Sequence, residues 1–291
     1  MEKNKQQAKQ EQVDTTYIRS SPFDSADQKE VAAEDKICKQ VIKVLRYIPE
    51  IHKNPEFAYY KAPFSLDSSI LTALHYIKEN LDSSLSYRYS CQMAICGSCS
   101  AMVNGQPKLL CQTFLKDYAP QAVITIEPLA HFLIIRDLIV EISDFIDKLV
   151  SVKPYIISQE AEKFQKNKGE NMLQEFVQTQ AQLQVFKRYS MCINCLLCYA
   201  ACPQYGRNKD FVGPAALALA TRYNLDSRDN GKKQRSQSYT EAHDGLWECT
   251  FAGFCSQVCP KMVNPATAIQ SMKLDTVLSS FEKILRIKKV K

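Results

Sequence analysis

Twelve cysteines in a chain of 291 residues constrain the fold more than any other feature, because eleven of them fall into three ordered groups. The groups are Cys91-x4-Cys96-x2-Cys99 with Cys111 after eleven further residues, then Cys192-x2-Cys195-x2-Cys198-x3-Cys202-Pro203, then Cys249, Cys255 and Cys259-Pro260. Such short spacings let one loop direct several thiolates at one centre. The pattern therefore predicts metal binding.

The first group has the spacing of a plant-type ferredoxin loop around a [2Fe–2S] cluster. Three thiolates in one loop wrap one side of such a cluster, while a more distant strand brings the fourth. Gly97 and the small Ser98 and Ser100 should let backbone N–H groups approach the sulfurs, where hydrogen bonds tune the reduction potential. The predicted ligands are Cys91, Cys96, Cys99 and Cys111.

The second group matches the bacterial ferredoxin run, in which three cysteines hold one cubane cluster and the fourth reaches another. The third group follows the same template, with Ala252 at the position of the second ligand. The reciprocal crossing rule predicts one site from Cys192, Cys195, Cys198 and Cys259, and another from Cys202, Cys249 and Cys255.

Ala252 offers no atom that can bind iron, so the third site is expected to hold [3Fe–4S], next to a [4Fe–4S] cluster at the second site. A cubane whose fourth iron carries a water is the alternative at the third site. The twelfth cysteine, Cys38, lies in a predicted strand, where a buried, inert thiol is expected.

Two other uses of cysteine fit less well. Disulfide frameworks belong mostly to small extracellular proteins, and their cysteines rarely recur two residues apart. Structural zinc requires closed sets of four ligands, into which the seven C-terminal cysteines do not divide. The histidines are scattered, follow no zinc-finger spacing, and are interpreted as structural: His52, His75, His131 and His243.

Residues 37–134 are predicted to form a mixed domain with the element order of a β-grasp ferredoxin. Strands are expected within 37–47, 56–64 and 122–127, with a hairpin turn at Asn104-Gly105. Asp67, Ser68 and Ser69 are N-cap candidates for a helix with an apolar stripe at Ile70, Leu74, Ile77 and Leu81. Residues 1–36 are polar throughout and are expected to be a disordered extension.

Residues 135–291 are predicted to form an all-helical domain of the bacterial ferredoxin type. From about Ile135 an apolar stripe (Leu138, Ile142, Phe145, Leu149) indicates a helix that Pro154 stops. A peripheral connection rich in Gln, Glu and Lys follows over 159–185, and the rest reads as short helices between cysteine loops. Pro214 suits the first turn of a helix through Ala220. The expected fold class is α+β.

Composition excludes several functions. The chain is 45% hydrophobic with net charge +6 and no long basic run, so no nucleic-acid partner is expected. Its eight glycines form neither G-x-G-x-x-G nor a P-loop, which places substrate chemistry on a partner.

The basic cluster near the C-terminus is either a solvated helix end or a surface attracted to an anionic membrane. It consists of Lys283, Arg286, Lys288, Lys289 and Lys291. No secretory signal, transit peptide or membrane span is predicted.

Over about residues 38–275 the motifs resemble the iron–sulfur subunit of succinate dehydrogenases and fumarate reductases. The segments are S-C-Q-M-A-I-C-G-S-C at 90–99, C-I-N-C-L-L-C-Y-A-A-C-P-Q-Y-G at 192–206 and W-E-C-T-F-A-G-F-C-S-Q-V-C-P-K at 247–261. The resemblance implies electrons running between FAD on a flavoprotein subunit, the three clusters in order, and a quinone. It also implies transmembrane anchor subunits and a peripheral position on the cytoplasmic face of the bacterial inner membrane.

The resemblance is closest to the fumarate reductase branch, which usually works with menaquinol. In the succinate dehydrogenase branch a Trp typically follows the C-P of the second motif; here Gln204-Tyr205-Gly206 follows, and the only tryptophan is Trp247. By resemblance, Thr250, Phe251, Gln270 and Lys273 match positions that approach quinone, although Gln270 and Lys273 also fit an ordinary polar helix face.

Three alternative functions remain. The complex could work in the direction of succinate oxidation. The chain could be a stand-alone polyferredoxin carrier, which would be monomeric and without flavin. A soluble thiol-linked fumarate reductase fits less well, because those subunits carry extra paired cysteines, and none follows Cys259 here.

Overall fold

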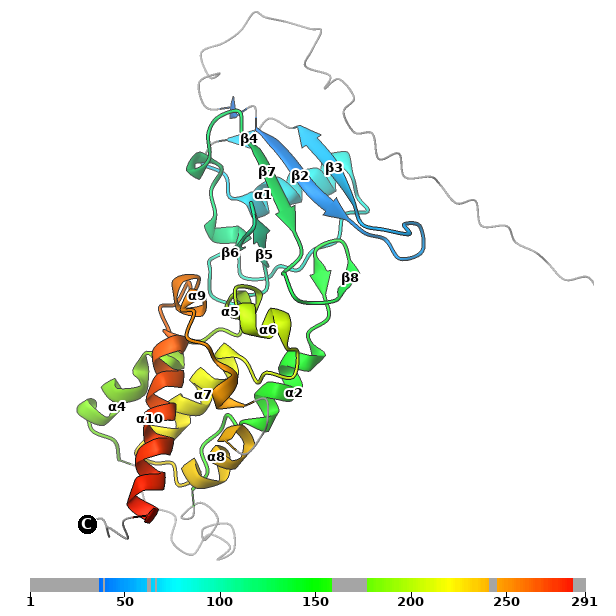
Figure 1. The fold of residues 1–291 in the computed structure, drawn as a ribbon. Helices are drawn as coiled ribbons and strands as arrows, with labels where there is room; N and C mark the ends of the chain where they lie inside the picture. The colour runs from blue at the N-terminus through cyan, green and yellow to red at the C-terminus, as the bar shows by residue number, and fades with distance from the viewer. Residues whose placement is uncertain are drawn as a thin grey trace, which may run out of the picture.

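The computed structural model describes residues 37–38, 40–61, 64–65, 67–158, 177–240 and 245–284. The predicted extension 1–36, His243, most of the peripheral connection and most of the basic C-terminal cluster lie outside the described residues, as does the side chain of Cys38. A half rich in β-strands precedes a helical half (Figure 1), so the predicted α+β class is confirmed.

A five-stranded mixed sheet forms the N-terminal half, in the order β3-β2-β7-β5-β6. Its strands are β2 (Val41–Arg46), β3 (Glu56–Lys61), β5 (Ser100–Val103), β6 (Gln106–Leu109) and β7 (Val123–Glu127). β2 pairs in parallel with β7, and the other pairings are antiparallel. Short strands β1 (Ile37–Cys38) and β4 (Phe64–Ser65) pair beside it. Side chains alternate along β2, so that Ile42 and Val44 enter the core.

Local signals predicted well the helix that covers this sheet and the hairpin within it. Helix α1 (Ile70–Tyr76) begins after Ser69, whose hydroxyl accepts a hydrogen bond from the Thr72 N–H at 3.1 Å. A π-helical turn, η3 (Ile77–Leu81), extends it. Asn104 and Gly105 join β5 to β6 with φ of 49° and 76°, as a two-residue primed turn requires. Both predictions are confirmed.

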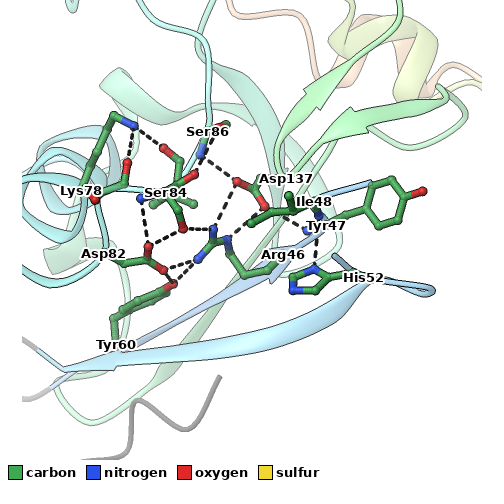
Figure 2. A network of polar contacts seen from close by, with 12 residues as sticks. Arg46, Tyr47, Ile48, His52, Tyr60, Lys78, Asp82, Ser84, Ser86 and Asp137 are labelled. Atoms are coloured by element: carbon green, nitrogen blue, oxygen red, sulfur yellow. Dashed lines mark hydrogen bonds and ion pairs between the residues drawn. The ribbon is translucent and has the colours of Figure 1, made fainter. Parts of the chain in front are cut away.

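Figure 2 shows a buried ionic network around Arg46, the last residue of β2. Its guanidinium donates to Asp137 Oδ1 at 3.0 Å and to the Tyr60 hydroxyl at 2.8 Å, and it pairs with Asp82. Burial alone would raise the pKa of Asp82, but hydrogen bonds from Ser84 and Tyr60, together with Arg46, lower it. Because removing one partner would leave a buried charge, such a network fixes the loops it joins.

The helix expected from about Ile135 begins later, so that prediction is wrong for residues 135–142. Strands β8 (Ile134–Arg136) and β9 (Ile139–Val140) form a small hairpin there, and α2 spans Ser143–Ser151. Asp137 turns the chain with φ of 46° while its carboxylate accepts N–H bonds from Tyr47 and Ser86 at 2.9 and 2.8 Å. These long-range bonds override the local helical pattern. The domain boundary at 134/135 stays a prediction.

The C-terminal half consists of helices of four to 20 residues around the cysteine loops. They are α4 (Gln180–Lys187), α5 (Leu197–Ala200), α6 (Pro203–Arg207), α7 (Pro214–Asn224), α8 (Lys232–Thr240), α9 (Phe254–Gln257) and α10 (Pro265–Ile284). Single 3-10 turns η6 (Tyr189–Met191) and η7 (Leu246–Glu248) belong to this half, whereas η4 (Leu110–Gln112) and η5 (Leu115–Asp117) lie between β6 and β7 in the N-terminal half. Pro214 begins α7 as predicted, though the helix runs past Ala220.

One continuous apolar core joins the two halves. Leu129 and Val140 from the first half belong to the same buried cluster as Leu196, Leu197 and Tyr199 from the second. In Figure 1, α5 and α9 accordingly lie next to the end of the sheet that carries β5 and β6. None of the helices described here is both long and apolar enough to cross a membrane.

Candidate metal centres

The first cysteine loop, residues 91–99, directs backbone N–H groups at its own sulfurs. Cys91 Sγ accepts from the N–H groups of Ile95 and Cys96 at 3.3 and 3.2 Å. Cys111 Sγ, brought by η4 after β6, accepts from the Ala94 N–H at 3.3 Å. Hydrogen bonds of this kind stabilise negative charge on thiolates and tune the potential of a cluster. The four predicted ligands thus share one loop-and-strand cradle.

The four cysteines of this cradle differ in how far they are buried. Cys99 and Cys111 are buried, whereas Cys91 and Cys96 are half-buried. Burial is the main cause that raises the pKa of Cys99 to about 12, and the nearby Cys111 and Cys96 add to it. Hydrogen bonds from Ser98 and Cys91 lower the pKa of Cys96 to about 6. The cradle therefore has one side facing the core and one facing the surface.

The seven remaining cysteines gather in two neighbouring sets. Burial raises the pKa of Cys195 to about 11, and the nearby thiols of Cys192 and Cys259 add to the rise. In the other set, burial and then Cys202 and Cys249 raise the pKa of Cys255 to about 11.

The set of Cys202, Cys249 and Cys255, hereafter the third set, adjoins the set of Cys192, Cys195, Cys198 and Cys259, hereafter the second set. Burial raises the pKa of Cys198 well above its usual range, and the nearby thiols of Cys195, Cys192, Cys255 and Cys259 add to the rise. Cys255 belongs to the other set, so the two sets lie side by side. The ligand sets that the crossing rule predicts, and iron binding at them, stay predictions.

Segments 192–202 and 249–259 have the same local backbone. Cys195 lies between two residues of positive φ, Asn194 at 52° and Leu196 at 66°. Ala252 likewise lies between Phe251 at 61° and Gly253 at 80°. Helices α5 and α9 follow, and each carries a cysteine, Cys198 or Cys255, as its second residue. Ala252 therefore occupies the backbone position of a ligand without providing one.

A shallow pocket opens at this third set. Its lining includes Cys202, Cys249 and Cys255 together with Ala252. The buried Gln204, which also lines the pocket, donates from its amide to the Glu248 carboxylate at 2.7 Å and so joins the segment of Cys202 to that of Cys249. Three thiols and one methyl group thus surround the same space.

The donor chemistry fits iron–sulfur clusters. Thiols with raised pKa values become ligands only after losing their protons, and the positive charge of iron offsets that cost. Left-handed residues next to right-handed ones, as in all three loops, form N–H concavities that suit cluster binding. Across the described ranges, no three His, Cys, Asp or Glu side chains converge closely enough for a single metal ion. A cluster of several irons spreads its thiolates farther apart than one zinc ion does.

The four residues matched to quinone positions lie on both sides of Cys249. Thr250 and Phe251 are exposed and line the pocket of the third set. Lys273, on α10, donates from Nζ to the Cys249 carbonyl at 2.7 Å. Gln270 Nε2 is buried and has no hydrogen-bond partner in the described part of the chain. Lys273 therefore lies beside the third set, and Gln270 precedes it by three residues on α10.

Sequence reasoning missed one contact of Gly97 and two further residues at these centres, Gln204 and Glu248. Gly97 was expected to make room for N–H groups, yet its open side faces Cys195 in the second loop. Gln204 and Glu248 join two cysteine segments, and their spacing of 44 residues gives no local signal. Contacts between distant segments cannot be found from periodicity.

Comparison with known proteins agrees with this geometry. Residues 41–147 match a 2Fe-2S iron-sulfur cluster binding domain, and residues 188–263 match a 4Fe-4S dicluster domain. The fumarate reductase iron-sulfur subunit of Haemophilus influenzae is 52% identical over 81% of this chain and 92% of its own length. The chain belongs to the family of fumarate reductase and succinate dehydrogenase iron–sulfur subunits. It is thus an electron-transfer subunit with a [2Fe–2S] domain and a [4Fe–4S] dicluster domain.

Other family members are more distant. A mitochondrial succinate dehydrogenase [ubiquinone] iron-sulfur subunit of Arabidopsis thaliana is 32% identical over 86% of this chain and 79% of its own length. Among solved structures, a chain of the Mycobacterium smegmatis Sdh1 complex in the apo form matches with a TM-score of 0.70. That match covers 82% of this chain and 97% of the other at 23% identity, so it shows the shared fold.

Proposed function

We propose that this subunit relays electrons between the FAD of a flavoprotein subunit and membrane menaquinol in a quinol:fumarate reductase. The position of Ala252 carries the proposal. Because it replaces a ligand at a backbone position equivalent to Cys195, the third site offers three thiolates and suits [3Fe–4S]. Bound clusters would supply one-electron redox chemistry, and the chain's part is ligation, burial and hydrogen bonding.

The surface next to the third site supports contact with transmembrane anchor subunits. Large apolar side chains remain exposed there: Trp247 by 51%, Phe251 by 58%, Phe254 by 49% and Met262 by 80%. Such a concentration marks an interaction surface rather than a random scatter of apolar residues. The proposed location is peripheral, on the cytoplasmic face of a bacterial inner membrane.

The surface over the first loop supports a different partner. Met93 and Ile95, which flank the cysteines of the cradle, are exposed by 70% and 57%. In the chain they lie between the half-buried Cys91 and Cys96. We assign this surface to the flavoprotein, since electrons from FAD would enter where ligands lie nearest the surface.

Lys273 and Gln270 on α10 are proposed quinone contacts, together with Thr250 and Phe251 from the pocket lining. The Lys273 ammonium already reaches the carbonyl of Cys249, so a quinone oxygen bound there would lie beside both the third site and a proton donor. The buried Gln270 amide has an open donor for a second contact. Menaquinol is favoured because Gln204-Tyr205-Gly206 replaces the tryptophan-bearing segment typical of ubiquinone-linked relatives.

Steady-state assays on the purified membrane complex test this function. The proposal predicts that fumarate-dependent menaquinol oxidation exceeds succinate-dependent ubiquinone reduction. The reverse ratio would assign the complex to succinate oxidation. Purification of this chain alone, monomeric and without flavin, would favour the polyferredoxin carrier.

Lys273→Ala provides the residue-level test. Loss of a proton donor or orienting group should slow menaquinol oxidation by about 100-fold while all three cluster signals remain. Lys233→Ala, at an exposed position on α8, is the matched control and should retain the rate of the unaltered complex. An unchanged rate in Lys273→Ala would remove this residue from the quinone site.

A further inference from the structure

Gly97 brings the first and second cysteine loops into direct contact. A Cβ built on Gly97 would lie 2.9 Å from Cys195 Cβ, 2.9 Å from the Ile193 carbonyl oxygen and 3.0 Å from Cys195 Cα. All these distances are shorter than carbon or oxygen atoms tolerate, and two of the three atoms belong to the backbone. Only glycine therefore permits the two loops to approach this closely.

The contact joins two predicted ligand sets across the boundary between the halves. Gly97 follows Cys96 directly, and its neighbour in space, Cys195, belongs to the second set. Cys96 is thus connected to Cys195 by one peptide link and one non-bonded contact. No other residue has to lie between the two ligand-bearing segments.

The contact between the two loops is small, because a cavity lies directly beside it. A cavity of about 250 Å³ next to it is lined from one side by Cys96, Gly97 and Ser98, and from the other by Asn194, Cys195 and Leu196. The shared apolar core, which includes Leu138 and Leu197, holds the two halves together around the cavity. The loops touch at Gly97 while space remains beside them, so a larger residue could separate them without unfolding either half.

We infer that Gly97 is a positioning residue that sets the separation of the first and second cluster sites, an inference that rests on the proposed electron-transfer function. Transfer between these sites moves one electron: the site that loses it is oxidised by one electron, and the other is reduced by one. No bond forms and no proton moves. Because electron tunnelling and magnetic coupling both fall steeply with distance, van der Waals contact between the two ligand-bearing loops favours both by keeping the sites close.

Gly97→Ala tests the inference in the intact complex, and the chain offers a matched control. Gly97 has φ of 72°, so alanine there introduces both backbone strain and a steric clash. Gly105, in the exposed β5–β6 turn, has φ of 76° with nothing within 4 Å of a built Cβ. Gly105→Ala therefore introduces the strain without the clash. The readout is microwave power saturation of the reduced [2Fe–2S] signal, with the second cluster either oxidised or reduced.

In the unaltered complex and in Gly105→Ala, reduction of the second cluster should raise the half-saturation power of the [2Fe–2S] signal. In Gly97→Ala this rise should be lost or reduced, and flash-initiated transfer between the two sites should slow. Equal behaviour of the two variants would overturn the inference. If Gly97→Ala assembles no clusters, the measurement on the unaltered complex is used instead. A rise in the half-saturation power of its [2Fe–2S] signal upholds the close approach of the two sites. No rise contradicts that close approach and with it the inference.

The same data separate this inference from the proposed function. If the unaltered complex lacks either a [2Fe–2S] or a [4Fe–4S] signal, the cluster assignment itself fails. If both signals are present and Gly97→Ala matches Gly105→Ala, the subunit still carries electrons and only the role of Gly97 is rejected.

Discussion

Segments 192–202 and 249–259 are two versions of one loop that differ in what the second ligand position holds. Each has two residues of positive φ around that position, then a one-turn helix with a cysteine as its second residue. The first version places Cys195 there and the second places Ala252. The comparison shows that the backbone forms without the thiol, so the chemistry of a site can change while its fold is kept.

The surroundings of the two loops differ as well. The first packs against Gly97 of the neighbouring half, whereas the second opens to a pocket with the exposed Phe251 at its rim. The predicted four-cysteine site therefore lies next to the first cysteine loop, and the predicted three-cysteine site lies at a pocket lined by exposed apolar side chains. This arrangement suits a middle and a terminal position in an electron path.

The largest expected effect comes from making the loops alike. Ala252→Cys places a thiol where the first loop has Cys195, so the third site should gain one iron and become [4Fe–4S]. Low-temperature EPR should lose the oxidised [3Fe–4S] signal, and iron analysis should rise by one atom per chain. Ala252→Val, which adds bulk without a ligand atom, should keep the [3Fe–4S] signal. A persistent three-iron signal in Ala252→Cys would contradict the equivalence of the two positions.

A smaller effect is expected from the hydrogen bond between Gln204 and Glu248, which joins the end of the first segment to the start of the second. Gln204→Leu leaves the Glu248 carboxylate without its donor at 2.7 Å and should destabilise the third site by about 1 kcal/mol. Thermal loss of the third cluster's EPR signal should then begin at a lower temperature than loss of the second. Glu248→Gln keeps an acceptor for Gln204 and should retain most of the stability. Equal losses of thermal stability in the two variants would show that Gln204 and Glu248 do not stabilise the third site through this hydrogen bond.

The smallest effect is expected at the residue after the variable position. Gly253 has φ of 80° with nothing within 4 Å of a built Cβ, so Gly253→Ala should cost only the strain of a left-handed residue, about 1 kcal/mol. Leu196 already bears this strain at the equivalent place in the first loop. Thermal denaturation should show a small decrease with all cluster signals intact. Loss of the third cluster would mean that glycine is required there for another reason.

Sequence reasoning succeeded where neighbours along the chain decide the structure. Ser69 caps α1 and Asn104-Gly105 turns the hairpin, because both depend on local backbone bonds. The assignment of the cysteines to three clusters, which was also made from their spacing, stays a prediction.

Prediction from the sequence failed where contacts between distant segments determine the local structure. The turn at Asp137 depends on bonds to Tyr47 and Ser86, so a helical apolar pattern gave the wrong element there. Arg46 lies on the buried face of β2 only because Asp82 and Asp137 meet it in the folded chain. The contact of Gly97 with Cys195 is likewise a product of packing between halves.

The central claim is that three ordered cysteine sets hold three different clusters, the last of which lacks one iron because of Ala252. Low-temperature EPR of the anaerobically purified complex, as isolated and after graded reduction, tests it most directly. The account predicts an oxidised [3Fe–4S] signal that disappears on mild reduction, followed by a reduced [2Fe–2S] signal. Absence of the oxidised signal, with iron analysis showing two complete cubanes, would contradict the assignment of the third site.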